Sequence, residues 1–309
     1  MTKHIQCQSL SKNYSSIKAL DGFDLELTIT QPTGIVSPNG AGKSTLFSIL
    51  CGFIKPSSGT VKVMGASPDS GENKSRLSLL PQDTAMFKGM NVITQLKHYA
   101  RLQGLNKSEA TKEVDKVLSL VQGTSYVKQL PENLSFGQRK RVMLAQSLIG
   151  NPELILMDEP TAGLDPVAAT EVRNLLRQLG NEYSVIISSH NLAEIEDICS
   201  DIVIMDKGKL VTHSSLADLT RSSQCFSLGL ENIAEVNLSD LLQGIDGINR
   251  VENDRNDMKS WLIYYENELA ESIQMKILST LTEHKIAVSE LKKGKALADE
   301  ISDVIRNNN

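Results

Sequence analysis

The sequence predicts an α/β protein in which a mostly parallel core sheet is flanked by helices. An antiparallel strand layer, an inserted helical lobe and a small α+β C-terminal domain complete the expected fold. Three patterns carry this prediction: an alternating apolar segment near the N-terminus, buried-type runs interleaved with helical segments, and a separate set of elements after a polar stretch. At 309 residues, the chain has room for one large core and a smaller second one.

The first of these patterns is a strand with one face exposed to water. Phe23, Leu25, Leu27 and Ile29 alternate with polar residues, which is the period of two expected when only one side of a strand is buried. We therefore expect an antiparallel layer at the edge of the fold. A short strand over residues 34–36 follows it.

The core sheet is predicted from short apolar runs at residues 154–157, 185–188 and 202–205. They alternate with helical segments at about 168–179 and 192–199, which is the order expected of parallel strands with helices on both faces.

Residues 83–149 are rich in helical patterns and form the expected inserted lobe. Charged and apolar residues are mixed through residues 107–121, and an apolar series with helical spacing follows at Val142, Leu144, Ala145, Leu148 and Ile149.

The polar stretch from Thr220 to Gln224 marks a domain boundary, so the predicted domains are residues 1–219 and 225–309. The second domain has patterns in the order β-α-β-β-α-β, which resembles a ferredoxin-like unit. No residues there indicate a chemical site, and a fold alone assigns no function.

Composition excludes several classes of protein. A net charge of −5 lacks the basic excess of a nucleic-acid-binding protein, so no nucleic-acid partner is expected. No apolar run approaches the roughly 20 residues that span a bilayer, and the N-terminus lacks an apolar signal core, so we expect a cytoplasmic chain. The widely spaced cysteines predict reduced packing residues; they are Cys7, Cys51, Cys199 and Cys225.

Residues 37–44 read Ser-Pro-Asn-Gly-Ala-Gly-Lys-Ser and have the spacing of a phosphate-binding loop. Small residues let backbone N–H groups surround phosphates, the Lys43 ammonium can reach the β- and γ-phosphates, and the Ser44 hydroxyl can ligate Mg²⁺. A helix over residues 45–50 would add its N-terminal dipole. A chance Gly-rich turn is the competing interpretation. The expected nucleotide-binding residues are Asn39, Gly40, Ala41, Gly42, Lys43, Ser44 and Thr45.

Asp158 and Glu159 end a buried strand, where adjacent carboxylates are costly unless a cation or a proton transfer requires them. Asp158 is placed to hold Mg²⁺, and Glu159 is placed to deprotonate an attacking water. A solvated acidic turn is the alternative, which is a poor explanation in a chain with a phosphate loop.

The segment Leu134-Ser-Phe-Gly-Gln138 comes before a helix, so Ser135 and the N–H groups behind it predict an anion site. A simple helix N-cap would explain Ser135 but not Gly137 and Gln138. In the order in which they occur, these motifs resemble the nucleotide-binding domain of ATP-binding cassette (ABC) proteins, and the resemblance runs from about Lys3 to Leu219.

The resemblance implies roles for further residues. Tyr14 would stack on adenine, with an ordinary exposed tyrosine as the alternative. Gln82 would contact Mg²⁺ or the water and link the sheet to the lobe, with a polar turn residue as the alternative. His190 would contact the γ-phosphate, and Asp165 would communicate across a dimer interface. The expected catalytic residues are Glu159, His190 and Gln82, and the expected metal ligands are Ser44, Gln82 and Asp158.

By the same resemblance, Ser135, Gly137 and Gln138 would complete the ATP site of a second subunit, so that two chains enclose two ATP molecules. The dimer would be a homodimer, or a heterodimer with a related ATPase subunit. Two residues depart from the family pattern. Ser37 replaces a glycine, which is harmless only if its φ is negative. Phe136 also replaces a glycine and adds bulk where the γ-phosphate would approach.

The function expected from the resemblance is the ATP-hydrolysing subunit of an ABC transporter, working with Mg²⁺ and a separately encoded polytopic permease. The permease would dock near the segment from Thr84 to Val92, where Met86 and Phe87 are apolar. It would hold the chain at the inner face of the cell membrane. The C-terminal extension resembles those of some exporters and favours export.

Two other functions compete with this one. Soluble ABC ATPases of translation usually carry two cassettes, and those of DNA repair usually contain a long coiled coil; this chain has one set of motifs and no sustained heptads. A cassette that only regulates is disfavoured because Glu159 and His190 are both present.

Overall fold

The computed structural model describes residues 4–83, 86–221, 224–232, 237–254, 257–266, 269–294 and 297–307. The chain divides into two compact units, Met1–His213 and Ser214–Asn309.

The first unit is built on a six-stranded sheet with the order β5-β6-β7-β3-β8-β9. The strands from β5 to β8 in this order pair in parallel, and every residue of β3, β6 and β7 is buried. Complete burial is expected of parallel strands that are covered on both faces. The prediction of a mostly parallel core is confirmed. The strands are Thr33–Val36 (β3), Leu77–Leu80 (β5), Leu154–Asp158 (β6), Ser184–Ser188 (β7), Asp201–Asp206 (β8) and Lys209–Ser215 (β9).

A second, antiparallel sheet has the order β2-β1-β4, with bounds His4–Tyr14 (β1), Ile17–Thr28 (β2) and Ser58–Val63 (β4). Phe23, Leu25 and Leu27 are buried while their neighbours in β2 are exposed, as the alternation predicts. Their side chains share one apolar cluster with Leu46 and Phe47 of helix α1, which spans Lys43–Leu50. The core of this unit therefore holds α1 together with both sheets.

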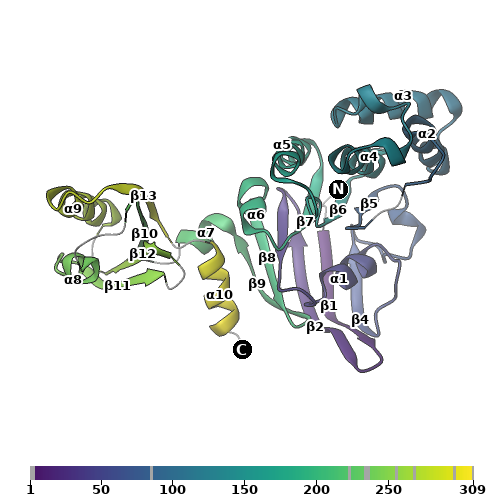
Figure 1. The fold of residues 1–309 in the computed structure, drawn as a ribbon. Coiled ribbons are helices and arrows are strands. Elements are labelled where there is room, and N and C mark those ends of the chain that lie inside the picture. The colour runs from purple at the N-terminus through teal and green to yellow at the C-terminus, as the bar shows by residue number, and fades with distance from the viewer. Residues whose placement is uncertain are drawn as a thin grey trace. The chain divides into compact units, whose positions relative to one another are not determined.

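The remaining helices of the first unit form two groups. Helices α5, Pro166–Glu182, and α6, Leu192–Ile198, alternate with the parallel strands. Helices α2, Val92–Leu102, α3, Lys107–Leu120, and α4, Phe136–Leu148, follow β5 and precede β6 in the chain. They gather beyond the end of the core sheet (Figure 1). These are the helices of the predicted inserted lobe.

The second unit holds a four-stranded sheet with the order β11-β12-β10-β13 and antiparallel pairing throughout. Helices α8 and α9 contribute to the apolar core of this unit through Leu238, Leu242, Ile273 and Ile277. The elements follow the order β-α-β-β-α-β, flanked by α7 and α10. Their bounds are Leu216–Arg221 (α7), Cys225–Leu230 (β10), Leu238–Gln243 (α8), Ile248–Asp254 (β11), Asp257–Tyr265 (β12), Ala270–Glu283 (α9), Val288–Lys293 (β13) and Leu297–Asn307 (α10).

The structural division after His213 comes before the polar stretch 220–224. The reason is that α7 lies in contact with α10, so the segment after β9 belongs with the second unit. Ser222 and Ser223, within the polar stretch, lie outside the described residues. Among the described residues, no helix combines the length and the apolar composition that crossing a membrane requires.

A chain that ends at Ser215, the last residue of β9, should keep the first unit folded, because that unit has its own apolar cluster. We expect a cooperative thermal unfolding transition and nucleotide binding within about threefold of the full chain, a difference of less than about 1 kcal/mol. Thermal melting and nucleotide titration of both chains measure this. A shortened chain that aggregates without a transition would show that the first unit needs the second.

Candidate functional site

A cavity of about 280 Å³ lies over the loop between β3 and α1. It is closed on another side by Gln82, after β5, and by Asp158 and Glu159, at the end of β6. Carboxyl ends of parallel strands meet at one edge of a sheet, and this edge is where ligands bind in open α/β folds. The other residues lining it are Ile17, Ala19, Asn39, Gly40, Ala41, Gly42, Lys43, Ser44 and Thr45.

The loop has the backbone conformation that its glycines permit. Gly42 precedes α1 with φ +104°, and a Cβ on it would lie 2.3 Å from the carbonyl oxygen of Ala19. Only glycine fits there, for reasons of both conformation and space. Helix α1 begins at Lys43 rather than at Thr45, because the left-handed Gly42 makes the turn and its carbonyl accepts from the N–H of Leu46.

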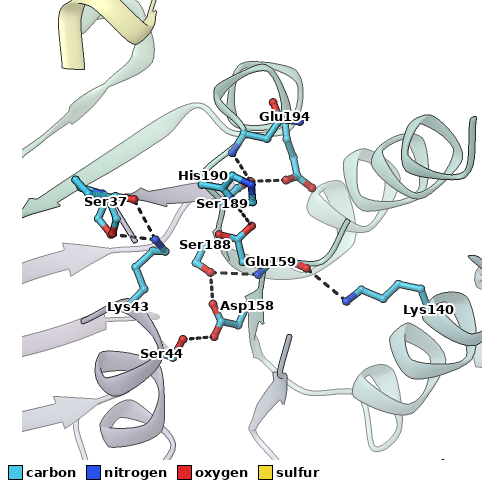
Figure 2. A network of polar contacts seen from close by, with 12 residues as sticks. Ser37, Lys43, Ser44, Lys140, Asp158, Glu159, Ser188, Ser189, His190 and Glu194 are labelled. Atoms are coloured by element: carbon cyan, nitrogen blue, oxygen red, sulfur yellow. Dashed lines mark hydrogen bonds and ion pairs between the residues drawn. The ribbon is translucent and has the colours of Figure 1, made fainter. Parts of the chain in front are cut away.

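Lys43 is buried at the base of the cavity. Its Nζ donates to the carbonyl oxygen and to the hydroxyl of Ser37, at 3.0 Å each (Figure 2). Burial lowers the pKa of Lys43, and the nearby carboxylates of Glu159 and Asp158 oppose that shift. Ser37 does not have a positive φ, so the serine is accommodated without backbone strain, and its hydroxyl adds an acceptor for the Lys43 ammonium.

Asp158 is buried and accepts two hydroxyl hydrogen bonds. Ser44 Oγ donates to Oδ2 at 2.6 Å, and Ser188 Oγ, from the end of β7, donates to Oδ1. These bonds offset part of the cost of burying the carboxylate. They also hold the carboxylate of β6 against the first turn of α1 (Figure 2).

Glu159 is buried and has φ +48°, in the left-handed region that a non-glycine residue seldom adopts. Its N–H donates to the carbonyl oxygen of Ser188 at 3.0 Å. His190 Nδ1 lies 2.8 Å from Glu159 Oε2, so a hydrogen bond joins the loop after β7 to the end of β6. Such backbone strain is concentrated at functional sites, because packing must hold it in place.

Glu194 of α6 is completely buried beside this group. Its Oε2 accepts from Ser189 Oγ at 2.6 Å, and the N–H of Asn191 donates to the same Ser189 oxygen at 3.0 Å. Burial raises the pKa of the Glu194 carboxyl, while the Ser189 hydrogen bond opposes the shift. Glu194 thereby fixes the backbone on either side of His190.

Lys140, Ser188 and Glu194 lie at the site, although the sequence motifs do not predict them. Lys140 Nζ, from α4, lies 3.4 Å from the carbonyl oxygens of both Gln82 and Glu159. The two serines before His190 could have signalled a hydroxyl donor at the strand end. Nothing in the spacing of Lys140 or Glu194 distinguishes them from exposed helix residues.

Residues 134–138 lead into α4, with Ser135 as its N-cap and Gln138 completing a capping box, so helix capping accounts for both of these residues. Ser135 Oγ accepts from the N–H of Gln138 at 3.2 Å, and Gln138 Oε1 accepts from the N–H of Ser135 at 3.0 Å. Of the described residues, those lining the cavity do not include Ser135, Gly137, Gln138 or Asp165. The structure therefore does not bring this segment to the phosphate loop of its own chain.

Phe136 and Asp165 are not among the described residues that line the cavity. The Phe136 ring is 52% exposed and approaches Gly163, where a Cβ would meet its Cε1 at 3.2 Å. Arg139 lies over the same ring, 5.5 Å from its centroid. Asp165 caps α5 by accepting from the N–H groups of Val167 and Ala168.

Tyr14 does not appear among the described residues that line the cavity. It is half-exposed, and the Lys12 ammonium lies over its ring, 5.2 Å from the centroid. Ile17, three residues further along the chain, does line the cavity although its side chain is 67% exposed. The apolar contact that the cavity offers comes from Ile17 and Ala19.

The residues present fit a magnesium ion. A hydroxyl (Ser44) and a carboxylate (Asp158) lie together in the cavity wall with Gln82, and Mg²⁺ prefers such oxygen ligands. Among the described residues, no group of three or more His, Cys, Asp and Glu side chains could hold a metal ion. An ion here would take its remaining ligands from water and phosphate.

Comparison with known proteins agrees with the geometry. Residues 20–162 match the family described as ABC transporter. The uncharacterized ABC transporter ATP-binding protein YhaQ of Bacillus subtilis is 32% identical over 242 residues, covering 77% of this chain and 79% of that protein. The linearmycin resistance ATP-binding protein LnrL of Bacillus subtilis is 30% identical over 238 residues, covering 76% of this chain and 75% of that protein.

A solved structure is similar as well. CbiO1 from Clostridium perfringens, described as part of the ABC transporter complex cbiONQ, superposes with a TM-score of 0.63 and 29% identity over 70% of this chain and 89% of that chain. Other relatives have names that state import or export.

Lys43→Ala should weaken nucleotide binding by about tenfold or more, because charge-assisted hydrogen bonds contribute about 1.5–3 kcal/mol each. Titration with a fluorescent ATP analogue measures the affinity. Lys62→Ala, which removes an exposed lysine of β4, is the matched control and should bind like the parent. Equal affinity of the Lys43 variant and the parent would contradict the assignment of the phosphate loop.

Proposed function

Because this chain belongs to the ABC transporter family, as an ATP-binding and ATP-hydrolysing subunit, we propose that it dimerises on ATP and powers a separately encoded membrane permease in export. The observation that supports a dimer is that the two parts of the expected ATP site lie apart from one another within one chain. The cavity holds the phosphate loop and the carboxylates, whereas the anion site at Ser135 lies apart from it.

The chemistry we propose follows from the side chains around the cavity. Backbone N–H groups of the loop and the Lys43 ammonium bind the phosphates of ATP. Glu159 would accept a proton from the attacking water, and His190, which is bonded to its Oε2, would orient that carboxylate and contact the γ-phosphate. Ser44, Gln82 and Asp158 would hold Mg²⁺, which when bound offsets negative charge on the phosphates.

Dimerisation supplies the second half of the site. Each chain would present Ser135, Gly137 and Gln138 to the ATP bound by its partner, in a two-fold arrangement that buries both nucleotides. The partner is a second copy or a related ATPase subunit. ATP favours the closed dimer because it binds both halves at once, and hydrolysis removes that preference.

A groove on the first unit suits the permease. It has a volume of about 580 Å³ and includes Phe53, Tyr99 and Leu102 in its wall. Phe53 and Leu102 are 70% and 67% exposed, and the half-exposed Phe87 ring stacks on Tyr99 at 6.0 Å. Exposed apolar side chains gathered in this way are typical of an interaction surface.

The groove lies next to the docking segment that we expect between Thr84 and Val92, because Phe87 of that segment stacks on Tyr99 in the groove wall. Thr84 and Ala85 lie outside the described residues, and Phe87 is held by its N–H, which donates to Gln95 Oε1 at 2.8 Å. Through such a permease the chain would lie at the inner face of the cell membrane. The proposed direction, export, rests on the C-terminal domain 225–309, which we propose to be a ferredoxin-like accessory domain following a cassette of residues 1–219.

Glu159→Gln should lower ATP turnover by about 10²–10⁴-fold, since it removes the proposed base while keeping the shape of the side chain. The same variant should accumulate as an ATP-bound dimer, because closure no longer ends in hydrolysis. Phosphate release and size-exclusion chromatography with ATP measure the two effects. Glu196→Gln, an exposed change on α6, is the control. Turnover at the parental rate by the Glu159 variant would remove Glu159 as the base.

Affinity purification from detergent-solubilised cells tests the permease. The parent should bring down a polytopic membrane protein, and a double variant, Phe53→Ser with Phe87→Ser, should lose it while ATP binding stays within about twofold of the parent. Met258→Ser, an exposed apolar position in the second unit, is the control. A double variant that retains the membrane protein would contradict docking in this groove. Recovery of ribosomal material alone would contradict the transporter function.

A further inference from the structure

Lys140 is a buried cation that the proposed chemistry does not use. It lies in the second turn of α4, is 3% exposed, and extends toward the end of β6 (Figure 2). A lysine on a helix surface normally keeps its ammonium in water by extending its side chain outward. Here the ammonium instead lies 3.4 Å from the carbonyl oxygens of Gln82 and of Glu159.

Burying the Lys140 ammonium costs free energy, so another interaction must compensate for it. Desolvation lowers the pKa of Lys140, and the carboxylates of Asp83, Glu194, Asp158 and Glu159 oppose that shift. An apolar residue of similar length would fill the same space without the desolvation cost, and such replacements are often neutral or stabilising. A packing role alone therefore does not account for a lysine.

The two carbonyls that face Lys140 belong to residues of the cavity wall. Gln82 follows β5, and Glu159 is the proposed base, held at φ +48°. The left-handed backbone conformation of Glu159 determines the direction in which its carbonyl oxygen points. A cation on the carbonyl favours the conformation, and with it the position of the Glu159 carboxylate beside His190.

Lys140 also lies close to the anion site in the chain. Ser135 caps the helix, Gln138 closes the cap, and Lys140 follows within the next turn of the same α4. A helix is a rigid secondary element of the kind that carries coupling between sites. A displacement of the capped end is therefore passed to the Lys140 ammonium, and through it to the ends of β5 and β6.

We propose that Lys140 is a positioning residue that couples the anion site at the start of α4 to Glu159 and Gln82 of the same chain. Binding of the second chain's ATP at Ser135 would then set the geometry of the reacting carboxylate in the first chain. This inference rests on the proposed function and adds to it a route by which the two sites of the dimer act together.

The test compares the parent, Lys140→Met and Lys140→Gln in the full chain, with MgATP as the probe. Lys140→Met keeps the length of the side chain and removes the charge. We expect its kcat to fall by about tenfold to a hundredfold, the loss typical of a misplaced reacting group, while the Kd for ATP stays within about threefold. Lys140→Gln keeps an N–H donor and should recover part of the rate.

Lys112→Met, an exposed change on α3 of the same lobe, is the matched control and should leave kcat and Kd unchanged. Thermal melting shows whether each variant is folded, and Lys140→Gln carries the test if Lys140→Met is not. Parental kcat in a folded Lys140 variant overturns the inference, and so does a loss of kcat matched by an equal loss of ATP affinity. Whichever result the Lys140 variants give, an active parent together with an inactive Glu159→Gln chain supports the proposed function separately.

Discussion

The structure of this site depends on keeping two adjacent carboxylates in place at the buried end of a strand. Asp158 and Glu159 lie where few water molecules can solvate them, so donors and cations from other elements must do so. The hydroxyls of Ser44 and Ser188 bind Asp158, and the ring of His190 binds Glu159. The parallel sheet makes this possible, because it brings the ends of its strands to one edge beside the first turn of α1.

The proposed dimer follows from which residues line the cavity and which do not. Ser135 does not line the cavity, and α4, the helix that it caps, contacts the cavity wall through Lys140, whose Nζ lies 3.4 Å from the carbonyl oxygen of Gln82. In the dimer that we propose, a second chain completes the nucleotide site. Phe136, packed on Gly163, ties the cap to the start of α5 as well.

Much of this could be predicted from the sequence, because a phosphate loop, a carboxylate pair and a histidine after a buried strand each imply a place in the fold. The wall residues Lys43, Ser44 and Glu159 do meet at one cavity. The spacing of Lys140 gives no such signal, since its hydrogen bonds depend on which carbonyl oxygens α4 meets after β5 and β6. The motifs do not single out Ile17, the first residue of β2, which lines the cavity, because its position depends on the pairing of β1 with β2. The contact between α7 and α10 also depends on tertiary packing, because α10 comes from the far end of the chain.

In the proposed dimer, one chain holds the reacting carboxylates while the other supplies the anion site. Steady-state ATP hydrolysis per chain, measured as the chain concentration is raised, tests it most directly. A specific activity that rises with concentration and then levels off, in step with ATP-dependent dimerisation, is the predicted result. A constant, non-zero specific activity over the same range, from chains that stay monomeric with ATP, would contradict it.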